Sequence, residues 1–229
     1  MPGHGHGASP DDATTPAEVK FPLQEPMVVD AWVARGSETL QTEGVQVFRQ
    51  DAGLRQWVER WITGQEEEVM RERVVDCGSD LPGICVGILT RMGVSPGQWE
   101  TGNVIFRSTK PPDPLGTVHR DLDETSAANL EQTGVVGTYN FWIPLSPVRC
   151  HPIGFVDRAT VREEDVGPFT CMGDADRTSL VAPRSWHRWF YFPDLEPGDV
   201  VVWKSVLVFH TALGLLTSSG ADHRLSVDL

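Results

Sequence analysis

After about residue 100 the sequence consists of short segments that are either apolar or alternate between apolar and polar residues. Turn-forming residues separate these segments. About eight such segments can be counted: 103–107, 117–121, 135–145, 153–156, 189–192, 200–203, 206–211 and 224–229. Gly, Pro and Asp lie between them, as in Glu196-Pro197-Gly198-Asp199. Many short strands joined by tight turns are typical of an antiparallel jelly roll or barrel, so we expect a mainly β fold.

The first hundred residues follow a different pattern. Apolar residues recur at helical spacing from Leu54 to Ile62, with Asp51 as a candidate N-cap, and a second helix is predicted from Pro82 to Met92. A short strand is predicted at 45–48. We expect these helices to pack outside the β core, which the segments above place at about 100–229.

The length and composition fit one domain. With 229 residues and 40% hydrophobic content the chain can bury a sizeable core. Residues 1–20 are rich in Gly, Pro, Ala and Asp and are predicted to be a disordered tail, which leaves 21–229 as a single domain. The segment 158–187 is polar, and we expect it to be an irregular insert that covers a binding site.

The charge and the cysteines exclude several classes. A net charge of −13 argues against a general nucleic-acid or anionic-membrane binder, because both need surplus Lys and Arg. There is no apolar stretch of about 18 residues and no secretory signal. The four cysteines form no CxxC pair. We therefore expect a cytoplasmic protein with reduced thiols and with neither nucleic-acid nor membrane partners.

Three residues form a candidate metal site. His119 and Asp121 are two positions apart near the end of a predicted strand, so their side chains share one face, and His210 ends another predicted strand. Two imidazoles and one carboxylate are the facial triad of non-haem Fe(II) oxygenases, which leaves three coordination positions open. The alternative for His119 and Asp121 is a strand-edge pair, and for His210 a buried structural histidine.

Two further residues on the last predicted strand could bind an acid. Arg224 can hold a carboxylate with two parallel hydrogen bonds, and Ser226 lies on the same face and can add a hydroxyl donor. The alternative is that Arg224 is a surface residue paired with a nearby aspartate, Asp222 or Asp228.

The roles of several other candidates are open. Asn140 and Trp142 share a face of a predicted strand, so both could line the pocket, Asn140 against substrate and Trp142 against the co-substrate, although Trp142 could equally be core. Trp186 could contact substrate or could only anchor its loop. Tyr191 and Lys204 are of interest only through the resemblance described below; either could reach a carboxylate, although a structural or exposed position fits each of them better.

The HxD…H…RxS pattern in a late β-rich region resembles the Fe(II)/2-oxoglutarate-dependent oxygenases. Two stretches are similar to the group of the cephamycin 7α-hydroxylation component and aspergillic-acid hydroxylase. The first is YNFWIPL at 139–145 with PIGFVD at 152–157, and the second is RWFYFPDL at 188–195 with WKS at 203–205 and FHTA at 209–212. The likeness covers 115–229. The segment between Lys204 and His210 is shorter and more apolar than is usual in that group.

The resemblance implies a double-stranded β-helix (a jelly roll, cupin-like) that holds Fe(II) and uses 2-oxoglutarate and O₂ to oxidise a small molecule. His119, Asp121 and His210 would bind the metal, and Arg224, Ser226 and Trp142 the co-substrate. Related halogenases replace the carboxylate with a small residue, so Asp121 implies hydroxylation, or else desaturation or cyclisation, and not halogenation. The likeness also implies a substrate from a secondary-metabolite pathway. Two alternatives remain from the residues alone: a non-catalytic protein that binds a metal or small acid, and a Zn-dependent hydrolase or isomerase.

Overall fold

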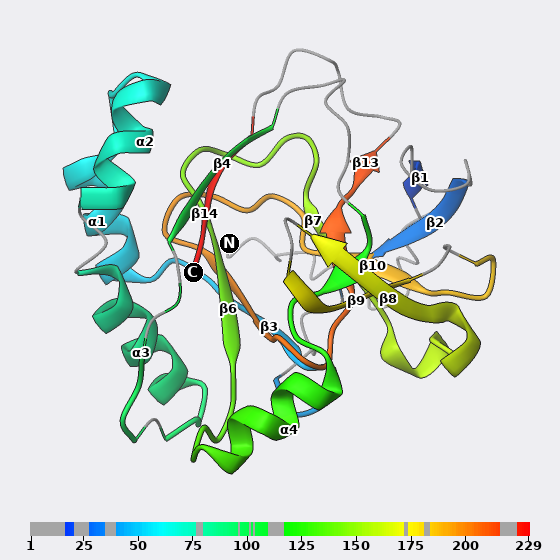
Figure 1. Cartoon of the computed structure of the whole chain (residues 1–229). Coiled ribbons are helices and arrows are strands. Elements are labelled where there is room, and N and C mark those ends of the chain that lie inside the picture. Colours follow the sequence, from blue (N-terminus) through cyan, green and yellow to red (C-terminus); the bar gives the residue numbers. More distant parts are fainter. Residues whose placement is uncertain are drawn as a thin grey trace, which may run out of the picture.

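The computed structural model of the chain describes residues 17–20, 28–34, 40–76, 80–95, 97–100, 102, 104–109, 117–171, 174–180, 184–215 and 224–229. In this part of the chain, helices cover one side of a body made of two β-sheets (Figure 1). None of the described helices is long and apolar enough to cross a membrane.

The smaller sheet has five strands, with β6 at its centre. In spatial order they are β3 (Val45–Phe48), β11 (Val200–Lys204), β6 (Tyr139–Pro144), β14 (Arg224–Asp228) and β4 (Ile105–Thr109). All neighbouring pairs are antiparallel. The β-branched run of β11 suits a strand that is covered on both faces.

The larger sheet has nine strands and is mixed, because β2 and β10 pair in parallel. In spatial order they are β13 (Gly214–Leu215), β1 (Ala17–Lys20), β2 (Val28–Val33), β10 (Trp189–Tyr191), β7 (Ile153–Val156), β12 (His210–Ala212), β5 (His119–Arg120), β9 (Asp174–Leu180) and β8 (Val166–Cys171).

Side chains alternate between the two faces along each strand, so the core is divided into layers. Phe141 and Ile143 of β6 face the helices, whereas Trp142 between them faces the other sheet and packs with Val201 and Phe155. A third cluster, which includes Trp189 and Val156, lies on the other face of the nine-stranded sheet. The inner layer therefore holds the residues from which a site between the sheets can be built.

Three helices pack on the five-stranded sheet, as predicted for helices outside the β core. They are α1 (Ala52–Trp61), α2 (Glu67–Asp76) and α3 (Leu81–Arg91). Asp51 caps α1 as predicted, because its side chain accepts a hydrogen bond from the Leu54 amide at 2.8 Å. The sequence did not indicate α2, nor α4 (Glu124–Gln132), which joins β5 to β6.

Four predictions need correction. The segment 158–187 is not irregular, because it contains the short 3₁₀ helices Arg158–Thr160 and Glu163–Asp165 and the antiparallel hairpin of β8 and β9. The predicted tail extended to residue 20, but Ala17–Lys20 form β1, and residues 1–16 lie outside the described part. The β core is not confined to 100–229, since β1, β2 and β3 belong to the sheets. His210 begins β12 instead of ending a strand.

Candidate metal centre

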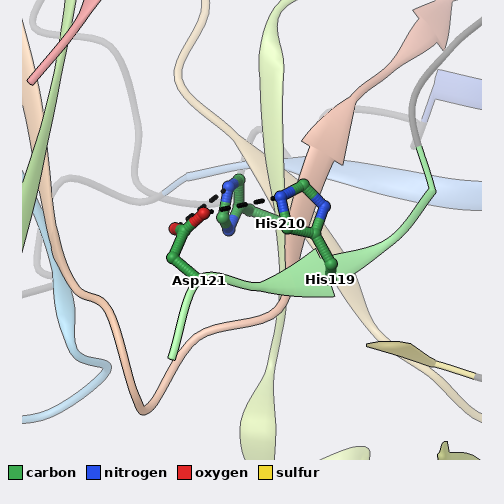
Figure 2. Close-up of side chains that lie close together, drawn as sticks. All are labelled: His119, Asp121 and His210. Carbon is green, nitrogen blue, oxygen red and sulfur yellow. Dashed lines mark ion pairs between the residues drawn. The ribbon is translucent and has the colours of Figure 1, made fainter. Parts of the chain in front are cut away.

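Strand pairing in the nine-stranded sheet brings the two histidines together. His119 on β5 and His210 on β12 are directly opposite each other in an antiparallel pair, which puts their side chains on the same face. Asp121 follows the last residue of β5 and turns back to the same point (Figure 2). One possible ligand atom from each of the three residues lies within 4.8 Å of the others.

Both imidazoles are oriented by backbone carbonyls. Nδ1 of His119 lies 2.7 Å from the Thr117 carbonyl oxygen, and Nδ1 of His210 lies 3.4 Å from that of Val208. A carbonyl oxygen only accepts, so Nδ1 is the donor in each ring, and Nε2 is the nitrogen that remains for a metal ion. A histidine that ligates a metal usually donates its other ring N–H in this way.

The Nε2 atoms converge on the carboxylate of Asp121. Nε2 of His119 lies 3.5 Å from Oδ1, and Nε2 of His210 lies 3.5 Å from Oδ2. Two imidazole nitrogens and a carboxylate at this separation are the donor groups that a divalent transition-metal ion takes. The donor set and its geometry therefore fit a divalent metal ion.

Two residues of the five-stranded sheet hold the carboxylate of Asp121. The side-chain amide of Asn140 donates a hydrogen bond to Oδ2, and the indole N–H of Trp203 lies 3.4 Å from the same oxygen. Asn140 and Trp203 are register partners on β6 and β11, so both side chains are on the inner face. Sequence reasoning missed Trp203: alternation puts it on the same face as Val201, but both faces of β11 are apolar and buried, so the sequence does not mark which face is the inner one.

The ring of Trp203 also packs against the metal site. It lies 4.7 Å from the ring of His210 and 5.6 Å from that of Phe155, measured between centroids. Such tilted and edge-on aromatic pairs are favourable. Trp203 thus contacts two of the three candidate ligands from the opposite sheet.

Arg224 and Ser226 lie on the inner face of β14, on the side opposite to Leu225 and Val227, which face the helices. Arg224 is buried, and burial lowers the pKa of its guanidinium to about 10. Its side chain donates to the carbonyl oxygen of His151. These contacts do not match the alternative of an ordinary surface arginine.

Trp142 and Ser226 lie near Arg224 on the inner face of the five-stranded sheet. The guanidinium of Arg224 lies 5.4 Å above the ring of Trp142, within the range of a cation–π contact. The Oγ of Ser226 is fully buried and has no hydrogen-bond partner among the described residues. A buried hydroxyl of this kind is unfavourable unless something else pairs with it.

Trp186 contacts other residues of its own segment, 158–187. Its indole N–H donates to Oδ2 of Asp165 at 3.2 Å, and the guanidinium of Arg162 lies 4.2 Å from its ring. His187 contacts the same carboxylate oxygen at 3.0 Å. These contacts favour the role of a loop anchor, and the prediction that Trp186 contacts substrate stays a prediction.

Tyr191 and Lys204 both lie away from the triad. Tyr191 packs against the outer cluster of the nine-stranded sheet. Lys204 is paired with Tyr139 on the face opposite to Asn140 and Trp203. Together with Leu122 and α4, Lys204 and Tyr139 line a cavity of about 220 Å³.

Among solved structures, the chain is similar to an iron and alpha-ketoglutarate-dependent endoperoxidase, NvfI. The TM-score is 0.67 at 17% identity, with 93% of this chain and 94% of that chain covered. A variant of NvfI in which one tryptophan is replaced by phenylalanine gives a TM-score of 0.65 at 20% identity, with 89% and 81% covered. At this level of identity the likeness establishes the fold, so the double-stranded β-helix is confirmed.

A search of proteins with curated functions finds no match to this chain. A family profile described as "YDMC: Oxidoreductase/YMDC permease-like domain" matches residues 110–229, slightly more than half of the sequence. The matched part contains His119, Asp121, His210 and Arg224. The chain therefore belongs to the oxidoreductase/YMDC permease-like domain family.

Proposed function

We propose that this protein is an Fe(II)- and 2-oxoglutarate-dependent oxygenase that oxidises a small molecule. The convergence of His119, Asp121 and His210 on one point is the observation that carries the proposal. Further support comes from the similar NvfI structures, which are described as iron- and alpha-ketoglutarate-dependent, alpha-ketoglutarate being 2-oxoglutarate.

The three ligands would supply two neutral nitrogen donors and one negative charge. They would bind Fe(II) from one side and leave three positions for other molecules. Bound Fe(II) with 2-oxoglutarate and O₂ supplies oxidative decarboxylation to succinate and CO₂, coupled to oxidation of the substrate. The backbone carbonyls of Thr117 and Val208 keep the imidazoles in the ligating tautomer during this cycle.

Arg224 would bind the distal carboxylate of 2-oxoglutarate. It is a buried cation on the sheet opposite to the two histidines, and a carboxylate is the group that its planar guanidinium pairs with best. The buried hydroxyl of Ser226 would donate a second hydrogen bond, and Trp142 would hold the guanidinium through its ring face. The two ends of the co-substrate would thus be held by different sheets.

Asp121 bears on the type of oxidation. A carboxylate at this position occupies the place that a halide would need, so we propose hydroxylation, desaturation or cyclisation and not halogenation. The two sequence stretches similar to the cephamycin 7α-hydroxylation component and aspergillic-acid hydroxylase support a substrate from secondary metabolism. Asn140 and Trp186 remain candidates for contact with that substrate.

The proposal is tested with purified protein under anaerobic conditions. Addition of Fe(II) and 2-oxoglutarate should produce the visible absorption band of an Fe(II)–2-oxo acid chelate, and admission of O₂ with ascorbate should then yield succinate. His119→Ala and Asp121→Ala should lose both signals, while Tyr191→Phe, on the outer face of the sheet, should keep them. Full activity in both ligand variants would contradict the site.

The same experiment separates the alternatives. Two histidines and a carboxylate also suit catalytic zinc. Retention of zinc instead of Fe(II) after anaerobic purification, with no succinate formed, would favour a hydrolase or isomerase. Binding of 2-oxoglutarate without any oxidation would favour a binding protein.

A further inference from the structure

Asn140 and Trp203 act on a single oxygen of the Asp121 carboxylate. The amide of Asn140 and the indole N–H of Trp203 both point at Oδ2, and both belong to the sheet opposite to β5. Oδ1 lies 3.5 Å from Nε2 of His119, and Oδ2 lies 3.5 Å from Nε2 of His210, so both oxygens are within reach of the metal position. Only the N–H donors of Asn140 and Trp203 at Oδ2 distinguish them. The two oxygens of Asp121 therefore have different surroundings.

The different surroundings of Oδ1 and Oδ2 affect which of the two oxygens can best bind a metal ion. A carboxylate has about four acceptor positions, two on each oxygen. Two N–H donors at Oδ2 use the acceptor positions of that oxygen, which leaves Oδ1 as the better donor to a metal ion. Hydrogen bonds to an ionised carboxylate are also stronger than neutral ones, so they resist rotation of the group.

We propose that Asn140 and Trp203 are positioning residues that force Asp121 to bind its metal ion through Oδ1 alone. The proposal rests on the proposed metal site and assigns to Asn140 a different role from the substrate contact predicted from the sequence. Trp203 contributes twice, because its ring also packs against the imidazole of His210.

Single-oxygen binding decides how many positions the metal keeps open. A six-coordinate ion with two imidazoles and one carboxylate oxygen has three positions left. A bound 2-oxo acid would need two of these positions, and O₂ would need the third. If both oxygens of Asp121 were bound, a position would be lost and the chelate would leave no place for O₂.

The number of waters on bound Mn(II) measures this directly. The protein is loaded with Mn(II) without 2-oxoglutarate, and broadening of its EPR lines in ¹⁷O-enriched water reports the waters bound. Asn140→Leu removes one donor at similar size, and Trp203→Phe removes the N–H while keeping an aromatic ring. Trp189→Phe, a buried tryptophan on the outer face of the nine-stranded sheet, is the matched control.

We expect three bound waters in the wild-type protein and in Trp189→Phe, and two in the double variant. In each of the single variants Asn140→Leu and Trp203→Phe the average number of bound waters should lie between two and three. Metal affinity should fall roughly 10- to 100-fold in the double variant. Three waters in the double variant, or two in the wild type, would overturn the role of Asn140 and Trp203 while leaving the metal site intact. Failure of the wild type to bind Mn(II) would overturn the proposed function itself.

Thermal unfolding without metal checks each variant for folding. Asn140 is half-buried, so Asn140→Leu carries the test by itself if Trp203→Phe does not fold. A purely structural role for Asn140 would lower thermal stability but would leave the water count at three.

Discussion

At the residue scale, Arg224 shows how a proposed ligand site can lower stability. Burial lowers the pKa of its guanidinium to about 10, which is still above neutral pH, so the folded protein keeps a charge out of water. A buried ion contributes less to folding than an apolar residue of similar volume often would. The carboxylate of a bound acid would offset this cost.

Replacement of Arg224 should separate stability from binding. Arg224→Met keeps the length of the side chain, and we expect the free energy of unfolding without ligand to change by no more than about 1 kcal/mol. The affinity for 2-oxoglutarate should fall by at least about 2 kcal/mol, or about 30-fold, because its carboxylate would lose a charged partner. Urea unfolding and calorimetric titration measure the two effects, and unchanged affinity would exclude Arg224 from the site.

Removal of the Ser226 hydroxyl should have a smaller effect of the same kind. Its Oγ has no hydrogen-bond partner among the described residues, so Ser226→Ala should leave stability nearly unchanged. Loss of one hydrogen bond to the acid should weaken 2-oxoglutarate binding by about 1 kcal/mol, or about fivefold. Ser205→Ala, in the turn after β11, serves as the control and should bind normally. Equal affinity in all three proteins would contradict the assignment.

The sequence indicates the candidate ligands more readily than the residues that contact them. His119 and Asp121 could be proposed because two positions along a strand share a face, and Arg224 and Ser226 follow the same rule. The contact of Trp203 with Asp121 depends on which strands face each other across the two sheets. That arrangement is a tertiary property that no local spacing encodes.

At the scale of elements, the segment 158–187 pairs with the larger sheet through its hairpin and is held together internally by one carboxylate. β9 pairs with β5, so the hairpin lies directly beside the strand of His119. Asp165 is buried and accepts hydrogen bonds from the Arg162 amide, the indole of Trp186 and the ring of His187. The base of the segment is thus tied together around a single acidic group.

Stability that depends on Asp165 should disappear in acid. Burial raises the pKa of this carboxyl, but its hydrogen bonds with His187, Arg162 and Trp186 more than offset burial and lower the pKa below the usual 3.8. The stabilisation is therefore present above about pH 4 and is lost as the pH falls through the lowered value.

Asp165→Asn tests this dependence. We expect a loss on the order of 2 kcal/mol in the free energy of unfolding at pH 7, since hydrogen bonds to a charged group are replaced by neutral ones. The difference from the wild type should shrink below about pH 4. Urea unfolding at several pH values measures it, and a difference that stays constant down to about pH 3 would contradict the role of the charge.

Sequence patterns failed for the elements that have little apolar character. Glu124–Gln132 contains only Leu130 and two alanines as apolar residues, and β9 has the polar sequence DADRTSL. Periodicity cannot detect a helix without an apolar stripe or a strand held mainly by backbone pairing. The well-patterned elements α1, α3, β7 and β11 lie close to their predicted bounds.

At the scale of the whole molecule, the proposed site joins the two sheets. His119 and His210 come from the nine-stranded sheet, whereas Asn140, Trp203 and Arg224 come from the five-stranded sheet. A metal ion and a dicarboxylate bound between them would add contacts that exist only when the sheets are packed together. Ligand binding should therefore stabilise the entire fold.

Mn(II) and 2-oxoglutarate should raise the melting temperature. At about 100 times the dissociation constant a ligand adds about 2.7 kcal/mol, which corresponds to roughly 5–10 °C for a chain of this size. In Arg224→Met, at the same 2-oxoglutarate concentration, the roughly 30-fold weaker affinity should reduce the increment from 2-oxoglutarate to about 0.9 kcal/mol or less, while that from Mn(II) remains. Differential scanning calorimetry gives both values, and an equal 2-oxoglutarate increment in Arg224→Met would contradict binding across the sheets.

A crystal structure of the protein with Mn(II) and 2-oxoglutarate is the most direct test of the central claim. It should contain one metal ion bound by Nε2 of His119, Nε2 of His210 and the carboxylate of Asp121, with the distal carboxylate of 2-oxoglutarate on Arg224. An ion bound elsewhere, or a side chain of His210 that does not reach the ion shared by His119 and Asp121, would contradict the account.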